Sequence, residues 1–130
     1  MTRARDILGI ISAAFLILSS AAHSVLGWRA IHGELAAARV PADLTVGLKI
    51  GWEFGGAAMF ALGVILLALF LQRLRGRNAS LIPARVVALV YLTFGAWALV
   101  ASGGEPFFIM FIVQGGVLAI AGFRRRQPNN

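Results

Sequence analysis

Four long apolar stretches, separated by polar segments, dominate the pattern of this chain. They cover residues 7–28, 50–71, 82–102 and 107–123. A helix rises 1.5 Å per residue, so about 20 apolar residues cross the roughly 30 Å hydrocarbon core of a bilayer. The interval 29–49 is predicted to be an outer connection, broken by Pro41 and containing a short interfacial helix. The pattern therefore predicts an all-α integral membrane four-helix bundle, with residues 1–130 in a single domain.

Composition supports this class and excludes others. The chain is 59% hydrophobic and 13% charged, whereas soluble domains contain about 25% charged residues. Its formal net charge of +7 does not indicate nucleic acid as a partner, because the basic residues lie between apolar stretches rather than on a soluble face with interleaved aromatics. With no cysteine, the chain has no disulfide framework and no cysteine-based metal site. The expected surroundings are a lipid bilayer.

The distribution of basic residues predicts the orientation. Nine of them belong to the N-terminus, the second connection and the C-terminus, and three belong to the first and third connections. The nine are Arg3, Arg5, Arg73, Arg75, Arg77, Arg85, Arg124, Arg125 and Arg126, and the three are Arg29, Arg39 and Lys49. By the positive-inside rule both termini are predicted to be cytoplasmic, so that the chain is a multi-pass membrane protein.

The predicted topology gathers polar side chains in the outer leaflet half. His23 lies roughly 7 Å inside the outer end of the first span, and Gln114 about 10 Å inside the start of the fourth. Glu53 stands near the outer end of the second span, and Tyr91 near the middle of the third. The candidate ligand or proton site consists of His23, Glu53, Gln114 and Tyr91. Outside it, the outer-side polar residues are His32, Glu34 and Glu105.

Two interpretations of these residues stay open. Ionisable residues at membrane depth are costly and often mark functional sites, so His23 and Glu53 are candidates for binding a cation, a proton or a polar ligand. In the alternative, the two are hydrated near the interface and hydrogen-bond to each other to orient two helices. Gln114 would then be an interhelical hydrogen-bond donor and Tyr91 a core residue.

Glycines mark the predicted packing faces of the helices. Small residues spaced by four let helix backbones approach closely in lipid, where packing must supply the attraction. Gly51, Gly55 and Gly63 follow this spacing on the second span. The full set of predicted packing glycines is Gly51, Gly55, Gly63, Gly95, Gly115 and Gly116.

Sequence signatures of enzymes are absent. The chain contains no Gly-x-Ser-x-Gly, no His-Glu-x-x-His and no nucleotide-binding loop. No cofactor is predicted. A metal or haem site assembled from His23 and His32 with Glu53 or Glu34 stays open as an alternative.

The first half of the chain carries a short motif, Ala22-His23-Ser24-Val25-Leu26-Gly27, followed by Trp52 at the head of the second span. It resembles a group of small uncharacterised bacterial four-span membrane proteins, in which a His-Ser-x-Leu-Gly element closes the first helix and a Trp-His pair stands in the second span. Here Glu53 replaces the second histidine. The resemblance implies a four-helix bacterial membrane protein and no particular activity.

We therefore expect a non-enzymatic four-helix protein of the inner membrane. It would be an accessory subunit of a larger membrane complex, or a small-ligand or ion-binding protein with a polar site in the outer leaflet half. The first alternative is a homo-oligomeric proton-coupled transporter or channel that uses Glu53 as its coupling carboxylate. The second is the metal or haem protein using His23 and His32.

Overall fold

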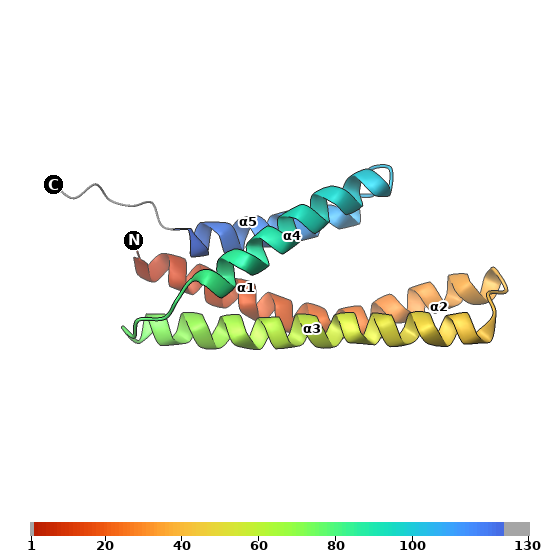
Figure 1. The fold of residues 1–130 in the computed structure, drawn as a ribbon, viewed down its shortest axis with the longest axis horizontal. Coiled ribbons are helices and arrows are strands. Elements are labelled where there is room, and N and C mark those ends of the chain that lie inside the picture. Colours follow the sequence, from red (N-terminus) through yellow and green to blue (C-terminus); the bar gives the residue numbers. More distant parts are fainter. Residues whose placement is uncertain (1, 124–130) are drawn as a thin grey trace. The chain divides into compact units, whose positions relative to one another are not determined.

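The computed structural model describes residues 2–123 and is helical along almost all of them, with no strand in that range (Figure 1). The elements are α1 (Thr2–Ala22), the π-helix η1 (His23–Gly27), α2 (Trp28–Ala37), α3 (Ala42–Leu74), α4 (Ile82–Ala101), the 3-10 helix η2 (Pro106–Phe108) and α5 (Ile109–Gly122). Since α1, η1 and α2 follow one another without a break, the described residues form four helices. The predicted all-α, four-helix fold class is confirmed.

Three of the helices are long and apolar enough to cross a membrane: Arg3–Ala37, Ala42–Leu74 and Ile82–Ala101. Large apolar side chains are exposed along them, such as Leu18 at 72%, Phe54 at 74% and Val100 at 82%. Exposed large apolar side chains suit a protein surrounded by lipid, where they lose nothing by facing outward. The last apolar segment, Pro106–Gly122, is shorter than 18 residues. The predicted fourth span is therefore helical but short for a bilayer.

The interval 29–49 differs from the prediction, because most of it is helical. Helix α2 continues the first helix to Ala37, and α3 already begins at Ala42. Residues 34–38 are all alanine, leucine or glutamate, which favour helices. The connection shrinks to residues 38–41, and Pro41 precedes the first turn of α3. With 33 residues, α3 is about 50 Å long and exceeds the thickness of a bilayer core.

The chain forms two compact units. Unit 1 comprises Met1–Ser12 with Leu66–Asn130, and unit 2 comprises Ala13–Ile65. The predicted single domain thus contains two units. Unit 1 holds the start of α1 and the end of α3, and unit 2 holds the rest of these two helices. Three of the arginines behind the predicted orientation, at positions 124–126, lie outside the described residues, and the cytoplasmic location of the termini stays a prediction.

In unit 2, the second half of α1 packs antiparallel against residues 42–65 of α3. Gly63 lies against Ile17 and Ala13, and Gly56 lies against Ser20 and Ser24. These pairs run in opposite directions along the two helices. In each pair a glycine supplies the close approach, since an added Cβ at Gly63 would lie 2.6 Å from Cγ1 of Ile17 and 3.2 Å from the Ala13 carbonyl oxygen.

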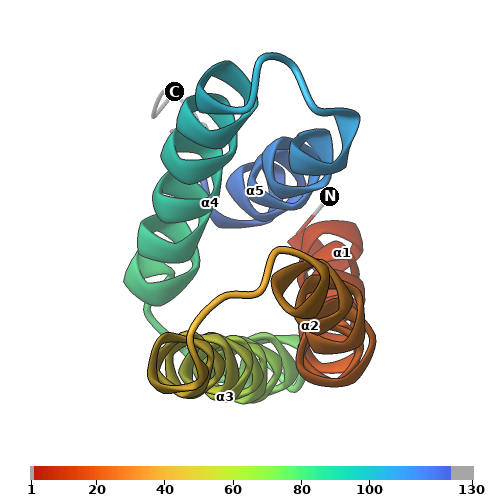
Figure 2. The same ribbon diagram turned by 90° about the vertical axis from the view of Figure 1, so that its right-hand side faces the viewer.

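In unit 1, α4 and α5 pack side by side and antiparallel, as both ribbon views show (Figures 1 and 2). The contacts again depend on glycine. A Cβ at Gly95 would lie 3.0 Å from the Ile112 backbone nitrogen, and one at Gly115 would lie 2.9 Å from the Leu92 nitrogen. The start of α1 packs against the end of α3 at Gly9, where the missing side chain leaves room for the fully buried ring of Phe70.

Candidate functional site

The most organised polar site in unit 2 is a reciprocal pair between His23 and Trp52. The two rings stack with their centroids 4.1 Å apart and their planes 7° from parallel. The Trp52 indole Nε1–H donates to the His23 carbonyl oxygen at 2.7 Å, and His23 Nε2 lies 3.2 Å from the Trp52 carbonyl oxygen. A carbonyl oxygen can only accept, so Nε2 carries the proton and Nδ1 is the ring nitrogen left for another partner.

The local backbone explains why this pair forms. His23 is the first residue of η1, and a π-helix widens the turn and disturbs the regular hydrogen bonds between backbone groups. The indole of Trp52 donates to the carbonyl at that position. Glycines make room for the rings, since a Cβ at Gly27 would lie 2.7 Å from the Trp52 ring and one at Gly55 would lie 3.3 Å from His23 Nε2. Single-turn π-helices often mark functional sites.

Glu53 is placed differently from the expectation that it pairs with His23. It follows Trp52 on α3, so its side chain points about 100° away from the ring that stacks on His23. Glu53 is exposed, and within residues 2–123 its carboxylate accepts no hydrogen bond. The partner of His23 is Trp52, which lies at the head of the second predicted span and is not among the predicted site residues.

Gln114 and Tyr91 lie in unit 1, whereas His23 and Glu53 lie in unit 2. Gln114 is buried and donates from Nε2 to the Ser12 carbonyl oxygen at 2.9 Å. Tyr91 is buried with its ring 5.7 Å from that of Phe111. These environments agree with the alternative in which Gln114 is an interhelical hydrogen-bond donor and Tyr91 is a core residue.

The outer-side polar residues do not gather around His23. The ring of His32 lies 5.8 Å from that of Trp28, while Glu34 and Glu105 are exposed. In the described part of the chain, no three histidine or acidic side chains come together in a way that could hold a metal ion. Each histidine is instead next to a tryptophan.

The predicted packing glycines divide into two groups. Gly55, Gly63, Gly95 and Gly115 face a neighbouring helix within their own unit at contact distance. Around Gly51 and Gly116, an added Cβ would meet nothing within 4 Å. Among residues 2–123, these two glycines therefore pack against no other helix, which differs from the prediction.

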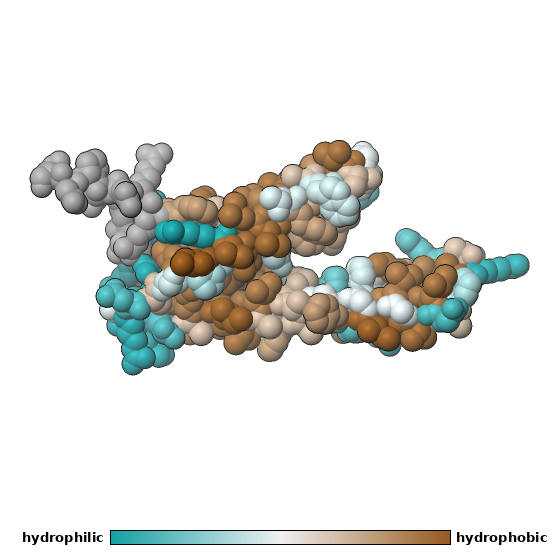
Figure 3. Space-filling model, in the orientation of Figure 1, coloured by the Kyte–Doolittle hydropathy of each residue, from teal (hydrophilic) through white to brown (hydrophobic). Residues whose placement is uncertain are grey.

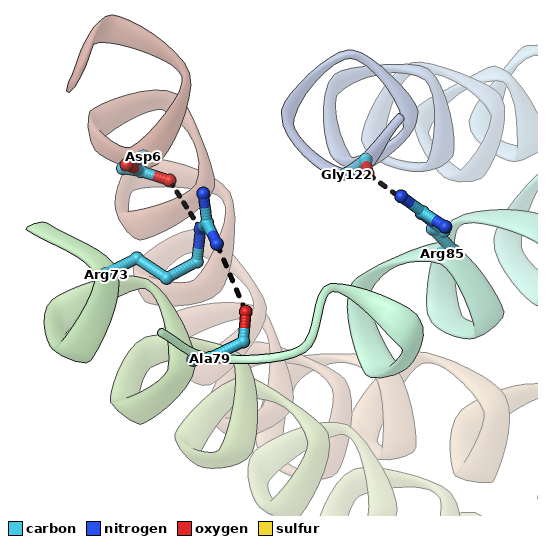
Figure 4. Close-up of polar contacts among 5 residues, drawn as sticks. All are labelled: Asp6, Arg73, Ala79, Arg85 and Gly122. Atoms are coloured by element: carbon cyan, nitrogen blue, oxygen red, sulfur yellow. Dashed lines mark hydrogen bonds and ion pairs between the residues drawn. The ribbon is translucent and has the colours of Figure 1, made fainter. Parts of the chain in front are cut away.

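Unit 1 contains an ion pair that sequence reasoning missed (Figure 4). Arg73 Nε donates to Asp6 Oδ1 at 2.9 Å, and both side chains are about nine-tenths buried. The same guanidinium donates from a second nitrogen to the Ala79 carbonyl oxygen at 3.1 Å. Arg73 thereby joins α1, α3 and the connection that leads to α4. The sequence did contain a signal for this pair, because Asp6 is the one acidic residue in the segments that hold the nine basic residues of the predicted cytoplasmic side.

A second arginine in the same unit caps the C-terminal end of a helix. Arg85 Nε donates to the Gly122 carbonyl oxygen at 3.0 Å, and its guanidinium carbon lies 5.4 Å from the centre of the Phe123 ring. The last carbonyls of a helix lack partners within the helix, and a cation there also complements the helix dipole. Arg85 therefore stabilises the end of α5.

Comparison with known proteins gives no relative: no protein-family model, curated protein or solved structure matches this chain.

Proposed function

We propose that this protein is a multi-pass protein of the bacterial inner membrane that serves as an accessory subunit of a larger membrane protein complex. The observation that carries the proposal is an exposed row on α3, here called the α3 seam. Its members are Val46, Ile50, Glu53, Ala57, Phe60 and Val64, and all six are exposed.

The spacing of the α3 seam is that of a helix–helix interface. Successive members are four, three, four, three and four residues apart, the alternation that keeps one face of a helix against a partner helix. Small Ala57 follows Glu53 on the row and leaves space for a neighbouring backbone. Four of the other members are large and apolar.

Glu53 distinguishes this face from a surface that only meets lipid. A carboxylate within an apolar span is costly when it faces hydrocarbon, so such residues pair with other groups. Within residues 2–123 no side chain supplies that pair. A transmembrane helix of another protein would cover the apolar side chains of the α3 seam. A cation or hydrogen-bond donor on that helix, opposite Glu53, would pair with the carboxylate.

Site-specific photo-crosslinking tests this proposal. A photoreactive amino acid replaces Phe60 on the α3 seam, and a matched variant carries it at Val100, which is exposed on α4. In cell membranes we expect a discrete adduct from position 60 that is absent at position 100. It should disappear when Glu53→Leu is added. A lack of adduct at position 60 would contradict the proposal.

The same exposed carboxylate supports a second candidate, a homo-oligomeric proton-coupled transporter or channel. If the α3 seams of two copies met, the two Glu53 carboxylates would face each other at the interface and form the coupling site of the pathway. The crosslinked adduct would then have twice the mass of the chain. Proteoliposomes loaded with a pH-sensitive dye would show proton entry driven by a potassium diffusion potential, and Glu53→Gln would abolish it while Glu34→Gln would not.

A further inference from the structure

We propose that the connection between α3 and α4 binds the headgroup of an anionic phospholipid through Arg75 and Arg77, with an acyl chain lying along the adjoining face of α4. This inference rests on the proposed membrane location but not on a protein partner. It concerns residues of unit 1, whereas the α3 seam belongs to unit 2.

The arginines of this region have two different roles. Arg73 is neutralised by Asp6, and Arg85 is bonded to the end of α5. Arg75 and Arg77 are exposed, and neither guanidinium donates a hydrogen bond to any of residues 2–123. They are thus two adjacent cations with unused donors, and guanidinium groups match the oxygens of a phosphate in shape and charge.

Neither acidic residue of unit 1 is available to neutralise Arg75 and Arg77. Unit 1 contains two acidic residues, Asp6 and Glu105. Asp6 is paired with Arg73, and Glu105 belongs to the connection at the opposite end of α4. Hydrophilic residues gather around the α3–α4 connection next to hydrophobic helix surface, as Figure 3 shows. An anion would therefore be attracted to this end of the unit.

The backbone holds the two arginines in a defined place. Gly76, with a φ of +78°, ends α3 in a Schellman motif, in which Arg77 N–H bonds to the Gln72 carbonyl oxygen and Gly76 N–H to that of Arg73. Further along, Ala79 is held by Arg73 and Leu81 is buried. A fixed connection loses less conformational entropy on binding than a loose one.

An apolar row on α4 begins directly after this connection. Ile82, Val86 and Leu89 are 64%, 53% and 53% exposed, and their spacing by four and three residues puts them on one face of the helix. From Ile82 to Leu89 the row extends about 10 Å along the helix at 1.5 Å per residue, which is about a third of the bilayer core. An acyl chain fits this row when its headgroup lies at the arginines.

The joint presence of cations and an apolar row favours lipid over a soluble polyanion. Nucleic acid would use the phosphate contacts alone and would gain nothing from Ile82, Val86 and Leu89. An anionic lipid uses both features, and attraction to basic residues at the membrane surface is a general property of such lipids.

A fluorescence-quenching experiment tests the proposal, and the lack of native cysteine makes it site-specific. The full chain with Ile82→Cys carries a small fluorophore at that position and is reconstituted into phosphatidylcholine vesicles. A minor fraction of the lipid is brominated phosphatidylglycerol in one sample and brominated phosphatidylcholine in the other. Because the composition is equal in both leaflets, the orientation of the protein does not affect the result. A matched label at Val100→Cys reports on the far end of α4.

We expect a several-fold preference for phosphatidylglycerol at position 82, up to roughly 30-fold for two arginines at a charged surface, and none at position 100. The double variant Arg75→Gln/Arg77→Gln should abolish the preference, whereas the lysine pair at these positions should keep most of it. The control Arg29→Gln/Lys49→Gln removes the same charge from unit 2 and should leave the preference unchanged. Raised salt should weaken it.

Three results would overturn the proposal. They are equal quenching by the two brominated lipids at position 82, a preference that survives Arg75→Gln/Arg77→Gln, and displacement of the anionic lipid by a short RNA. Absence of crosslinks at the α3 seam would refute the proposed subunit role while leaving this lipid preference intact, so the two proposals fail separately.

Discussion

The ion pair between Asp6 and Arg73 gives the sharpest quantitative prediction. At 2.9 Å, the direct attraction of two unit charges is about 6 kcal/mol at an effective dielectric constant of about 20. Desolvation of both groups offsets much of this, but removing one partner leaves the other charge buried, which costs about 3–5 kcal/mol. The pair lies near the helix ends, and its side chains keep about a tenth of their exposure. We therefore expect Asp6→Asn to lower the free energy of unfolding by about 2–3 kcal/mol.

Arg73→Gln should cost at least as much as Asp6→Asn, because it also removes the hydrogen bond to the Ala79 carbonyl oxygen. The assay is reversible unfolding of the full chain in mixed detergent micelles by added dodecyl sulfate, followed by circular dichroism. Exposed Glu34→Gln serves as the control and should change the stability by less than about 0.5 kcal/mol. In a double-mutant cycle the two changes should be strongly non-additive. A loss below about 1 kcal/mol for Asp6→Asn would show that solvent screens the pair and would refute the reasoning.

Three further predictions use the same unfolding assay. Gly63→Ala should lower the free energy of unfolding by about 1–3 kcal/mol, because its Cβ would meet backbone atoms of α1. Gly51→Ala, with open space around it, should leave the stability unchanged or raise it by up to about 1 kcal/mol. Equal effects of the two substitutions would contradict the described packing. Trp52→Phe keeps a smaller aromatic ring beside His23 but loses the bond to the His23 carbonyl oxygen, so it should cost at least about 1–2 kcal/mol. A stability equal to that of the unaltered chain would rule out a native bond. Arg39, just after α2, has a φ of +54°. Arg39→Gly should raise the free energy of unfolding by up to about 1 kcal/mol, because glycine adopts this left-handed conformation without strain. A lower stability would show that no strain exists there.

The sequence alone determined the helical class and the order of the four apolar helices. Runs of apolar residues long enough for a bilayer predict helices because every backbone group must be bonded within the segment. Hence the third predicted span, 82–102, agrees with α4 (Ile82–Ala101) to one residue. Pro83 in its first turn and Gly103 just past its end mark those limits locally. The secondary structure of the interval 29–49 was harder to predict, because its moderately polar, helix-favouring residues are compatible with both a connection and a helix.

The tertiary structure decided which polar groups meet. Hydropathy gives the depth of a side chain but not its direction, and neighbouring residues on a helix differ by about 100°. That rotation brings Trp52 rather than Glu53 to His23, and it leaves Glu53 on an exposed row. The bond between Asp6 and Arg73 joins residues 67 positions apart. No local pattern encodes such a pair, because it depends on the register in which two helices pack.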